Sequence, residues 1–198
     1  SPRRWLLVSR EMGVPVEEEG PSRWSVDHLF LDQDGIPTIV EVKRSNDTRI
    51  RREVVGQMLD YAANAVVYWP IEEIRRRFDD RCEAEGKDAD SELQGFLGNE
   101  VEAGKFWDSV KTNLQAGKVR LIFVSDSIPS ELQRIVEFLN SQMNPAEVLA
   151  LEVKQFVAGD MRTIVPRILG QTAEAQGKRN PSRGVRQWDE ATFFSDIR

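Results

Sequence analysis

The chain has 198 residues, of which 40% are hydrophobic and 30% are charged, and its formal net charge is -6. This composition is typical of a globular domain and excludes a disordered chain, while the acidic balance excludes a protein that coats nucleic acid with its whole surface. The longest apolar runs, such as residues 121–124, are far shorter than the ~20 residues of a transmembrane helix, so we expect no membrane partner. The single cysteine, Cys82, and the lack of a secretory signal predict a cytoplasmic protein.

The N-terminal part of the chain predicts a strand followed by a β-hairpin. Residues 4–12 have the compact apolar run of a strand, and residues 23–32 predict a second one. The Asp34-Gly35 pair that follows predicts a tight turn, because glycine readily adopts a positive φ. Residues 37–43 are then the antiparallel partner of the second strand.

The next segments predict helices. Apolar residues recur at helical spacing over residues 48–65, which indicates a helix with one buried stripe. Residues 65–69 predict a short strand that ends before Pro70. The more polar pattern over residues 70–117 predicts a helical insertion.

The chain then returns to a β-α-β pattern. Residues 119–126 predict a buried strand, residues 128–143 a helix, and residues 147–157 another strand. Residues 159–198 predict a linker, followed by an amphipathic segment that we expect to be the start of a truncated C-terminal element. The domain organisation we expect is a core (1–69), a helical insertion (70–117), a β-α-β completion of the same domain (118–158) and this last segment.

Three charged residues stand in the predicted hairpin, where apolar side chains are expected. Pairing through the turn places Asp27 and Glu41 on neighbouring strands, and the alternation of side chains directs Glu41 and Lys43 to one face. Two close carboxylates repel each other unless a cation neutralises them, and Mg²⁺ prefers such oxygen ligands. A nearby ammonium group can offset the charge that develops on a phosphoryl group. The pattern therefore predicts a magnesium-dependent site.

The order of these motifs resembles the PD-(D/E)XK nuclease superfamily. The matching residues are "VD", which ends at Asp27, and "EVK" at residues 41–43, followed by "GQMLDYA", in which Gln57 and Tyr61 fit a Q-x-x-x-Y motif. The resemblance covers residues 1–69 directly. It implies an α/β fold with a restriction-endonuclease-like mixed sheet flanked by helices. It also implies a divalent-metal-dependent nuclease that hydrolyses phosphodiester bonds, with DNA as the expected substrate in a repair, restriction or defence setting.

The resemblance also implies roles for single residues. Asp27, Glu41 and Lys43 would be catalytic, and Mg²⁺ or Mn²⁺ would be held by the two carboxylates and by the backbone carbonyl of Val42. Gln57 and Tyr61 would bind or orient the substrate. A cationic cluster would hold the phosphate backbone, and its members are Arg44, Arg49, Arg51 and Arg52. Many relatives act as dimers, so a homodimer is a further expectation.

Other readings of the same residues stay open at this point. Glu11 could supply an extra carboxylate to the metal, or it could be a surface residue beside a turn. His28 adjoins Asp27, but strand alternation directs it to the opposite face. The chain could be a nuclease-like module that binds nucleic acid or serves an assembly without cutting, or "VEVK" could be a solvated edge strand of an unrelated α/β protein.

Overall fold

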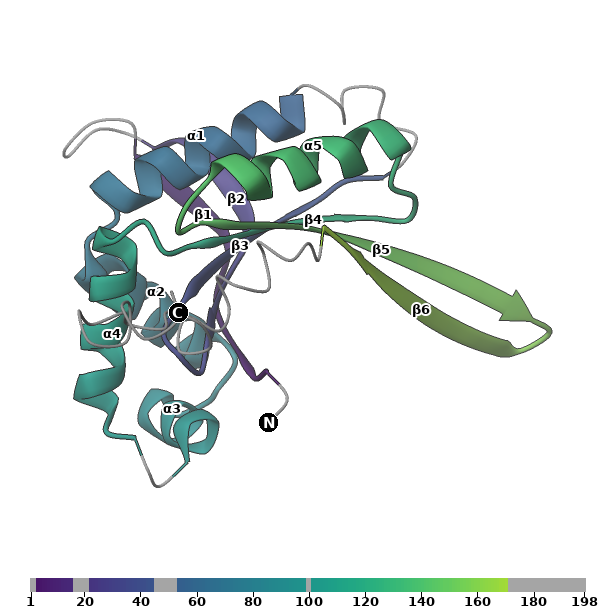
Figure 1. Cartoon of the computed structure of the whole chain (residues 1–198). Coiled ribbons are helices and arrows are strands. Elements are labelled where there is room, and N and C mark those ends of the chain that lie inside the picture. The colour runs from purple at the N-terminus through teal and green to yellow at the C-terminus, as the bar shows by residue number, and fades with distance from the viewer. Residues whose placement is uncertain (1–2, 16–21, 45–52, 99–100, 171–198) are drawn as a thin grey trace, which may run out of the picture.

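The computed structural model describes residues 3–15, 22–44, 53–98 and 101–170, and these form an α/β fold with one six-stranded mixed sheet (Figure 1). The spatial order of the strands follows the chain order. The strands β3, β4 and β5 run parallel to one another, and the other neighbours pair antiparallel. The strands are β1 (Trp5–Pro15), β2 (Ser22–Asp32), β3 (Pro37–Val42), β4 (Arg120–Ser125), β5 (Glu147–Ala158) and β6 (Met161–Leu169).

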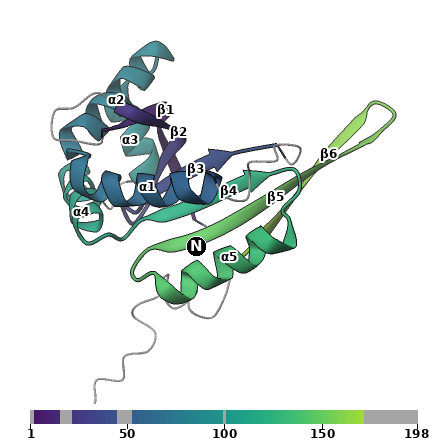
Figure 2. The same ribbon diagram turned by 90° about the horizontal axis from the view of Figure 1, so that it is seen from above.

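The helices cover one side of this sheet and one of its ends. Figures 1 and 2 show α1 and α5 over the same side of the sheet, and α2, α3 and α4 gathered at the end formed by β1 and the β2–β3 turn. No helix of the described residues is both long enough and apolar enough to cross a membrane. The helices are α1 (Glu53–Tyr68), α2 (Ile71–Ala84), α3 (Ala89–Leu97), α4 (Ala103–Gln115) and α5 (Ser130–Gln142).

The predicted hairpin turn between β2 and β3 is confirmed. Gly35 has a φ of 70°, and its N–H donates to the carbonyl of Asp32 at 2.9 Å. A Cβ at this position would lie 3.0 Å from the backbone nitrogen of Val110 on α4. Glycine is therefore required both by the positive φ and by the close approach of α4.

Two sequence-based predictions are wrong. Residues 65–69, predicted as a strand, belong to α1 as far as Tyr68, and the helix ends before Pro70. A β-branched residue costs a helix only a few tenths of a kcal/mol, whereas a strand needs a hydrogen-bonded neighbour. Residues 161–169, expected within a linker, form β6, and every residue of β6 pairs with a residue of β5.

Alternate strand residues face two different environments. Ile39 and Leu121 are fully buried in the core that α1 and α5 cover, together with Val148 and Ala150 of β5. Their neighbours in the sequence, such as Val40 and Ile122, point to the opposite face of the sheet. This alternation separates the sheet into a helix-covered face and a second face.

A buried ion cluster joins three strands at the amino end of β4. Arg120 is 2% exposed, and its Nε lies 2.6 Å from Oε2 of Glu147. Its Nη1 lies 3.2 Å from Oδ2 of Asp32 and donates to Oγ1 of Thr38 at 3.0 Å. Each charge is thus paired, as burial requires.

Candidate active site

The β2–β3 hairpin brings Asp27 and Glu41 together. The last hydrogen-bonded pair of the ladder is His28 with Val40, so the next position places Asp27 opposite Glu41 on the helix-covered face. The backbone N–H of Val42 donates to Oδ2 of Asp27 at 2.7 Å, which fixes the Asp27 carboxylate beside β3. Opposite pairs of this kind have their Cβ atoms only about 5 Å apart.

Glu41 is held in an unusual environment for a carboxylate. Its side chain is 2% exposed, although it stands near the end of the strand. Its Oε1 lies 2.8 Å from Nζ of Lys43, while its Oε2 is buried without a hydrogen-bond partner among the described residues. A buried carboxylate oxygen without a partner costs free energy, so this atom is the clearest sign of an incomplete site.

The pKa of Glu41 is raised above its usual value of 4.5, chiefly because burial removes water from the carboxylate. The ammonium group of Lys43 lowers this pKa through its hydrogen bond and charge, and the charge of Asp27 raises it again. Burial and repulsion by Asp27 therefore outweigh the single lysine. A divalent cation would supply the positive charge that this pair of carboxylates lacks.

Lys43 stands at the point where β3 meets β4. Its backbone N–H donates to the carbonyl of Val124 at 2.9 Å, which extends the parallel ladder beyond Val42. Its side chain is 31% exposed, so the ammonium group contacts Glu41 on one side and solvent on the other. The lysine can therefore reach a group that approaches from solvent.

The donor set fits a magnesium ion held by few protein ligands. Mg²⁺ keeps several waters and commonly binds one or two carboxylates plus substrate oxygens. Asp27 and Glu41 provide two carboxylates, one of which has the unpartnered oxygen described above. Across the described residues, no group of three or more His, Cys, Asp or Glu side chains could hold a metal ion. The two carboxylates fit a magnesium site whose remaining ligands are water and substrate oxygens.

A pocket of about 780 Å³ opens beside Lys43, at the carboxyl ends of β3 and β4 and beside the middle of β5. It is lined by Lys43 and the exposed Arg44 on one side, and by Ser125, Asp126 and Val153 on the other. For the turn at residues 125–127 the sequence allows either a ligand contact or, more simply, a cap of the helix that follows. The predicted β-α-β pattern carried the missing signal, because parallel strands end at the same edge of a sheet.

The remaining predicted site residues are distributed as follows. Gln57 lies on α1, over the face that carries Glu41, and is half-buried. Tyr61 stands one turn further along α1, but its side chain lies outside the described part of the chain. Three members of the cationic cluster, Arg49, Arg51 and Arg52, also lie outside the described residues.

Glu11 and His28 are placed differently relative to the carboxylate pair. The β1–β2 register places Glu11 opposite Asp27, where it is exposed and has a φ of 52°, although no group of three acidic side chains of the described residues includes it. Its role as an extra ligand stays a prediction. His28 lies on the face opposite Asp27, as strand alternation predicts, and its ring stacks on Phe30 with the centroids 6.1 Å apart. The candidate site is thus centred on Asp27, Glu41 and Lys43, with Arg44 at its rim.

Comparisons with models of known protein families, with curated proteins and with solved structures found no match to this chain. The chemistry of the site is thus argued from its own residues.

Proposed function

We propose that the chain is a divalent-metal-dependent nuclease of the PD-(D/E)XK superfamily, with a restriction-endonuclease-like core, that hydrolyses phosphodiester bonds in DNA. One observation carries the proposal: the buried Glu41 carboxylate has an unpartnered oxygen, lies opposite Asp27 and contacts the ammonium group of Lys43. A buried carboxylate oxygen without a partner is uncommon in folded proteins, so it supports a site that a cation would complete. A solvated edge strand would not bury Glu41 to 2% exposure.

In this proposal the two carboxylates hold Mg²⁺ or Mn²⁺, and the backbone carbonyl of Val42 is an additional candidate ligand. When bound, such an ion lowers the pKa of water and polarises a phosphoryl oxygen. Asp27 is already oriented by the N–H of Val42, so it would need little rearrangement to bind. The unpartnered Oε2 of Glu41 would then coordinate the ion.

Lys43 has the role of stabilising negative charge during hydrolysis. A water adds to phosphorus, the bond from phosphorus to the leaving oxygen breaks, and the leaving oxygen takes up a proton. Negative charge grows on the phosphoryl oxygens in this step, and a fixed ammonium group within reach of them stabilises it. The partial exposure of Lys43 and its contact with Glu41 favour this role.

The pocket beside Lys43 is the proposed path of the DNA backbone. Arg44 is exposed at its rim, where its guanidinium group can bind a phosphate. Because this contact is electrostatic, binding should weaken as salt rises. Arg49, Arg51 and Arg52 follow closely in the sequence and would extend the same cationic surface.

The test is cleavage of linear, nicked, branched and single-stranded DNA with Mg²⁺ or Mn²⁺, compared among the wild type, Lys43→Ala and Asp27→Asn. We expect cleavage that depends on the metal and falls at least about 100-fold in both variants. Lys111→Ala is the matched control, because Lys111 is exposed on α4, which packs on the turn of the hairpin and not on the end that carries Asp27 and Glu41. Its activity should equal that of the wild type.

A second readout separates catalysis from metal binding. Titration calorimetry with Mn²⁺ should show binding to the wild type and to Lys43→Ala, but weaker binding to Asp27→Asn. Cleavage that persists in both site variants would reject the assignment. DNA binding without cleavage by the wild type would leave the non-cutting nucleic-acid-binding module as the better description.

A further inference from the structure

The strands β5 and β6 extend beyond the body of the sheet as a two-stranded ribbon (Figures 1 and 2). Residues 154–168 are all exposed, although the two strands pair continuously from Ala150 with Leu169 to Ala158 with Met161. An isolated two-stranded ribbon is only marginally stable in water. Its outer strand, β6, also presents backbone groups that no other described strand pairs with.

The ribbon concentrates the exposed apolar surface of the described residues. Six of their ten exposed large hydrophobic side chains lie on it: Phe156, Val157, Met161, Ile164, Val165 and Ile168. Exposed apolar side chains gathered on one element in this way are typical of an interaction surface. Charged and polar side chains would dominate a ribbon whose role was only to reach into solvent.

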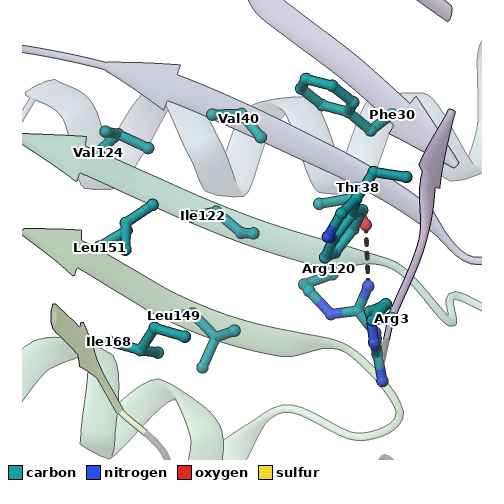
Figure 3. Close-up of a pocket in the computed structure, with 11 residues that line it drawn as sticks. Arg3, Phe30, Thr38, Val40, Arg120, Ile122, Val124, Leu149, Leu151 and Ile168 are labelled. Atoms are coloured by element: carbon teal, nitrogen blue, oxygen red, sulfur yellow. Dashed lines mark hydrogen bonds between the residues drawn. The ribbon is translucent and has the colours of Figure 1, made fainter. Parts of the chain in front are cut away.

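The same chain carries an apolar recess on the second face of the sheet, opposite α1 and α5. This recess has a volume of about 550 Å³, and Figure 3 shows its lining side chains along β2 to β6, from Phe30 through Ile122 to Ile168. Parallel strands are normally covered on both faces. Here the β3–β4–β5 segment has helices on one face only, as far as the described residues extend.

The ribbon and the recess share one face of the sheet. Ile168 lines the recess and pairs with Leu151, and strand alternation places Ile164 and Val157 on that same face, further along the ribbon. The ribbon cannot fold back onto its own recess while its strands stay extended. Ile164 pairs with Gln155, four positions along β5 from Leu151 at the edge of the recess, so it stands about 13 Å beyond the recess.

We propose that the ribbon of one copy packs on the recess of a second copy, so that a two-fold symmetric homodimer exchanges its ribbons reciprocally. The argument for a second copy is that one chain provides both the projecting apolar surface and the apolar surface that it would cover. A two-fold axis then makes each contact twice and closes the assembly.

The area available is sufficient for such a dimer. The three apolar side chains on the recess face of the ribbon, Val157, Ile164 and Ile168, expose on the order of 300 Å² per copy. Each ribbon would cover a similar area of the partner's recess, so the two reciprocal contacts would bury on the order of 1,200 Å² in total, the lower end of specific interfaces. Trp5, at the rim of the recess, is 42% exposed and would add to this area. Face-to-face packing of two β-layers, about 10 Å apart, is the geometry expected.

The first test is the concentration dependence of mass, measured by sedimentation equilibrium on the full chain. We expect the wild type to dimerise, and Ile164→Asp to raise the dissociation constant at least about 100-fold, because it places a charge in the interface. Thr163→Asp is the matched control, since Thr163 is the neighbouring exposed residue on the opposite face of the ribbon. It should change the constant less than about fivefold.

The second test uses two variants that each add one cysteine to the buried Cys82, Ile164→Cys and Ile122→Cys, mixed under mild oxidation. A disulfide between different chains is expected, because the two positions are about 20 Å apart within one chain but adjacent across the proposed interface. A wild type that stays monomeric at all concentrations would overturn the proposal. A dimer that survives Ile164→Asp unchanged would do the same, since its interface would lie elsewhere.

Discussion

Substitution of Glu41 by glutamine should stabilise the protein when no metal is present. The change keeps the shape of the side chain but removes a charge that is 2% exposed and has one unpartnered oxygen. Glutamine still has a polar atom at the unpartnered position, so the gain comes from removing a desolvated charge, and it is reduced by the lost ion pair with the part-exposed Lys43, which contributes about 0.2–1 kcal/mol. The net gain should be about 1–2 kcal/mol, or about 3–6 °C in Tm.

The pH dependence of this gain follows from the raised pKa of Glu41. A carboxyl group whose pKa is raised on folding stabilises the folded state below its usual pKa of 4.5, and this contribution is lost as pH rises through the raised value. Wild type and Glu41→Gln should therefore have similar free energies of unfolding near pH 4 and differ most near pH 8. Urea unfolding at both pH values measures the difference.

Magnesium should reverse the order of stability. A ligand that binds only the folded state, at a concentration of 100 times its Kd, stabilises it by about 2.7 kcal/mol, and only the wild type retains both carboxylates.

Glu152→Gln is the informative control. Burial raises the pKa of Glu152, but the Ile128 N–H, Lys154 and Arg167 lower it more, so its net shift is downward and its loss should destabilise the protein. If Glu41→Gln were instead less stable than the wild type at pH 8 without metal, Glu41 would be a structural residue and the reasoning would fail.

Three further substitutions test the site and the fold. Arg44→Ala should weaken DNA binding and reduce its salt dependence by about one ion, measured by fluorescence anisotropy across a salt series, while Lys43→Ala changes cleavage more than binding. Gly35→Ala should lower the free energy of unfolding by about 1–3 kcal/mol in urea, because a Cβ would meet α4 at a positive φ. The control Gly56→Ala, in open space on α1, should raise it by about 0.5–1 kcal/mol. Arg120→Ala should cost about 3–5 kcal/mol in the same assay, because it leaves two buried carboxylates without their shared partner.

Local chemistry was sufficient to predict the hairpin that carries the site. The Asp34-Gly35 turn fixes the register of β2 and β3, and this register places Asp27 opposite Glu41. The depth of burial of Glu41 was not predictable in this way. It depends on β4 and α1, which pack on β3 from distant parts of the chain.

The strand β6 was missed because it lacks the usual signal. Its residues from Met161 to Ile168 are exposed on both faces, so no alternation of buried and exposed positions marks it, and Pro166 argues against a strand interior. The prediction for residues 65–69 was wrong for the opposite reason. Their composition suits a strand, but α1 continues as far as Tyr68. In both cases the neighbouring structure decided the outcome.

The strand β3 also has a consequence for the order of folding events. Its link to β2 is local, since Asp27 and Val42 are 15 positions apart, whereas its link to β4 joins Thr38 with Arg120 across 82 positions. Short loops close at a lower entropy cost and sooner than long ones. The acidic hairpin can therefore form early, with its carboxylates still hydrated. We expect Glu41 to lose its hydration later, when β4 pairs with β3 and the long-range part of the sheet forms.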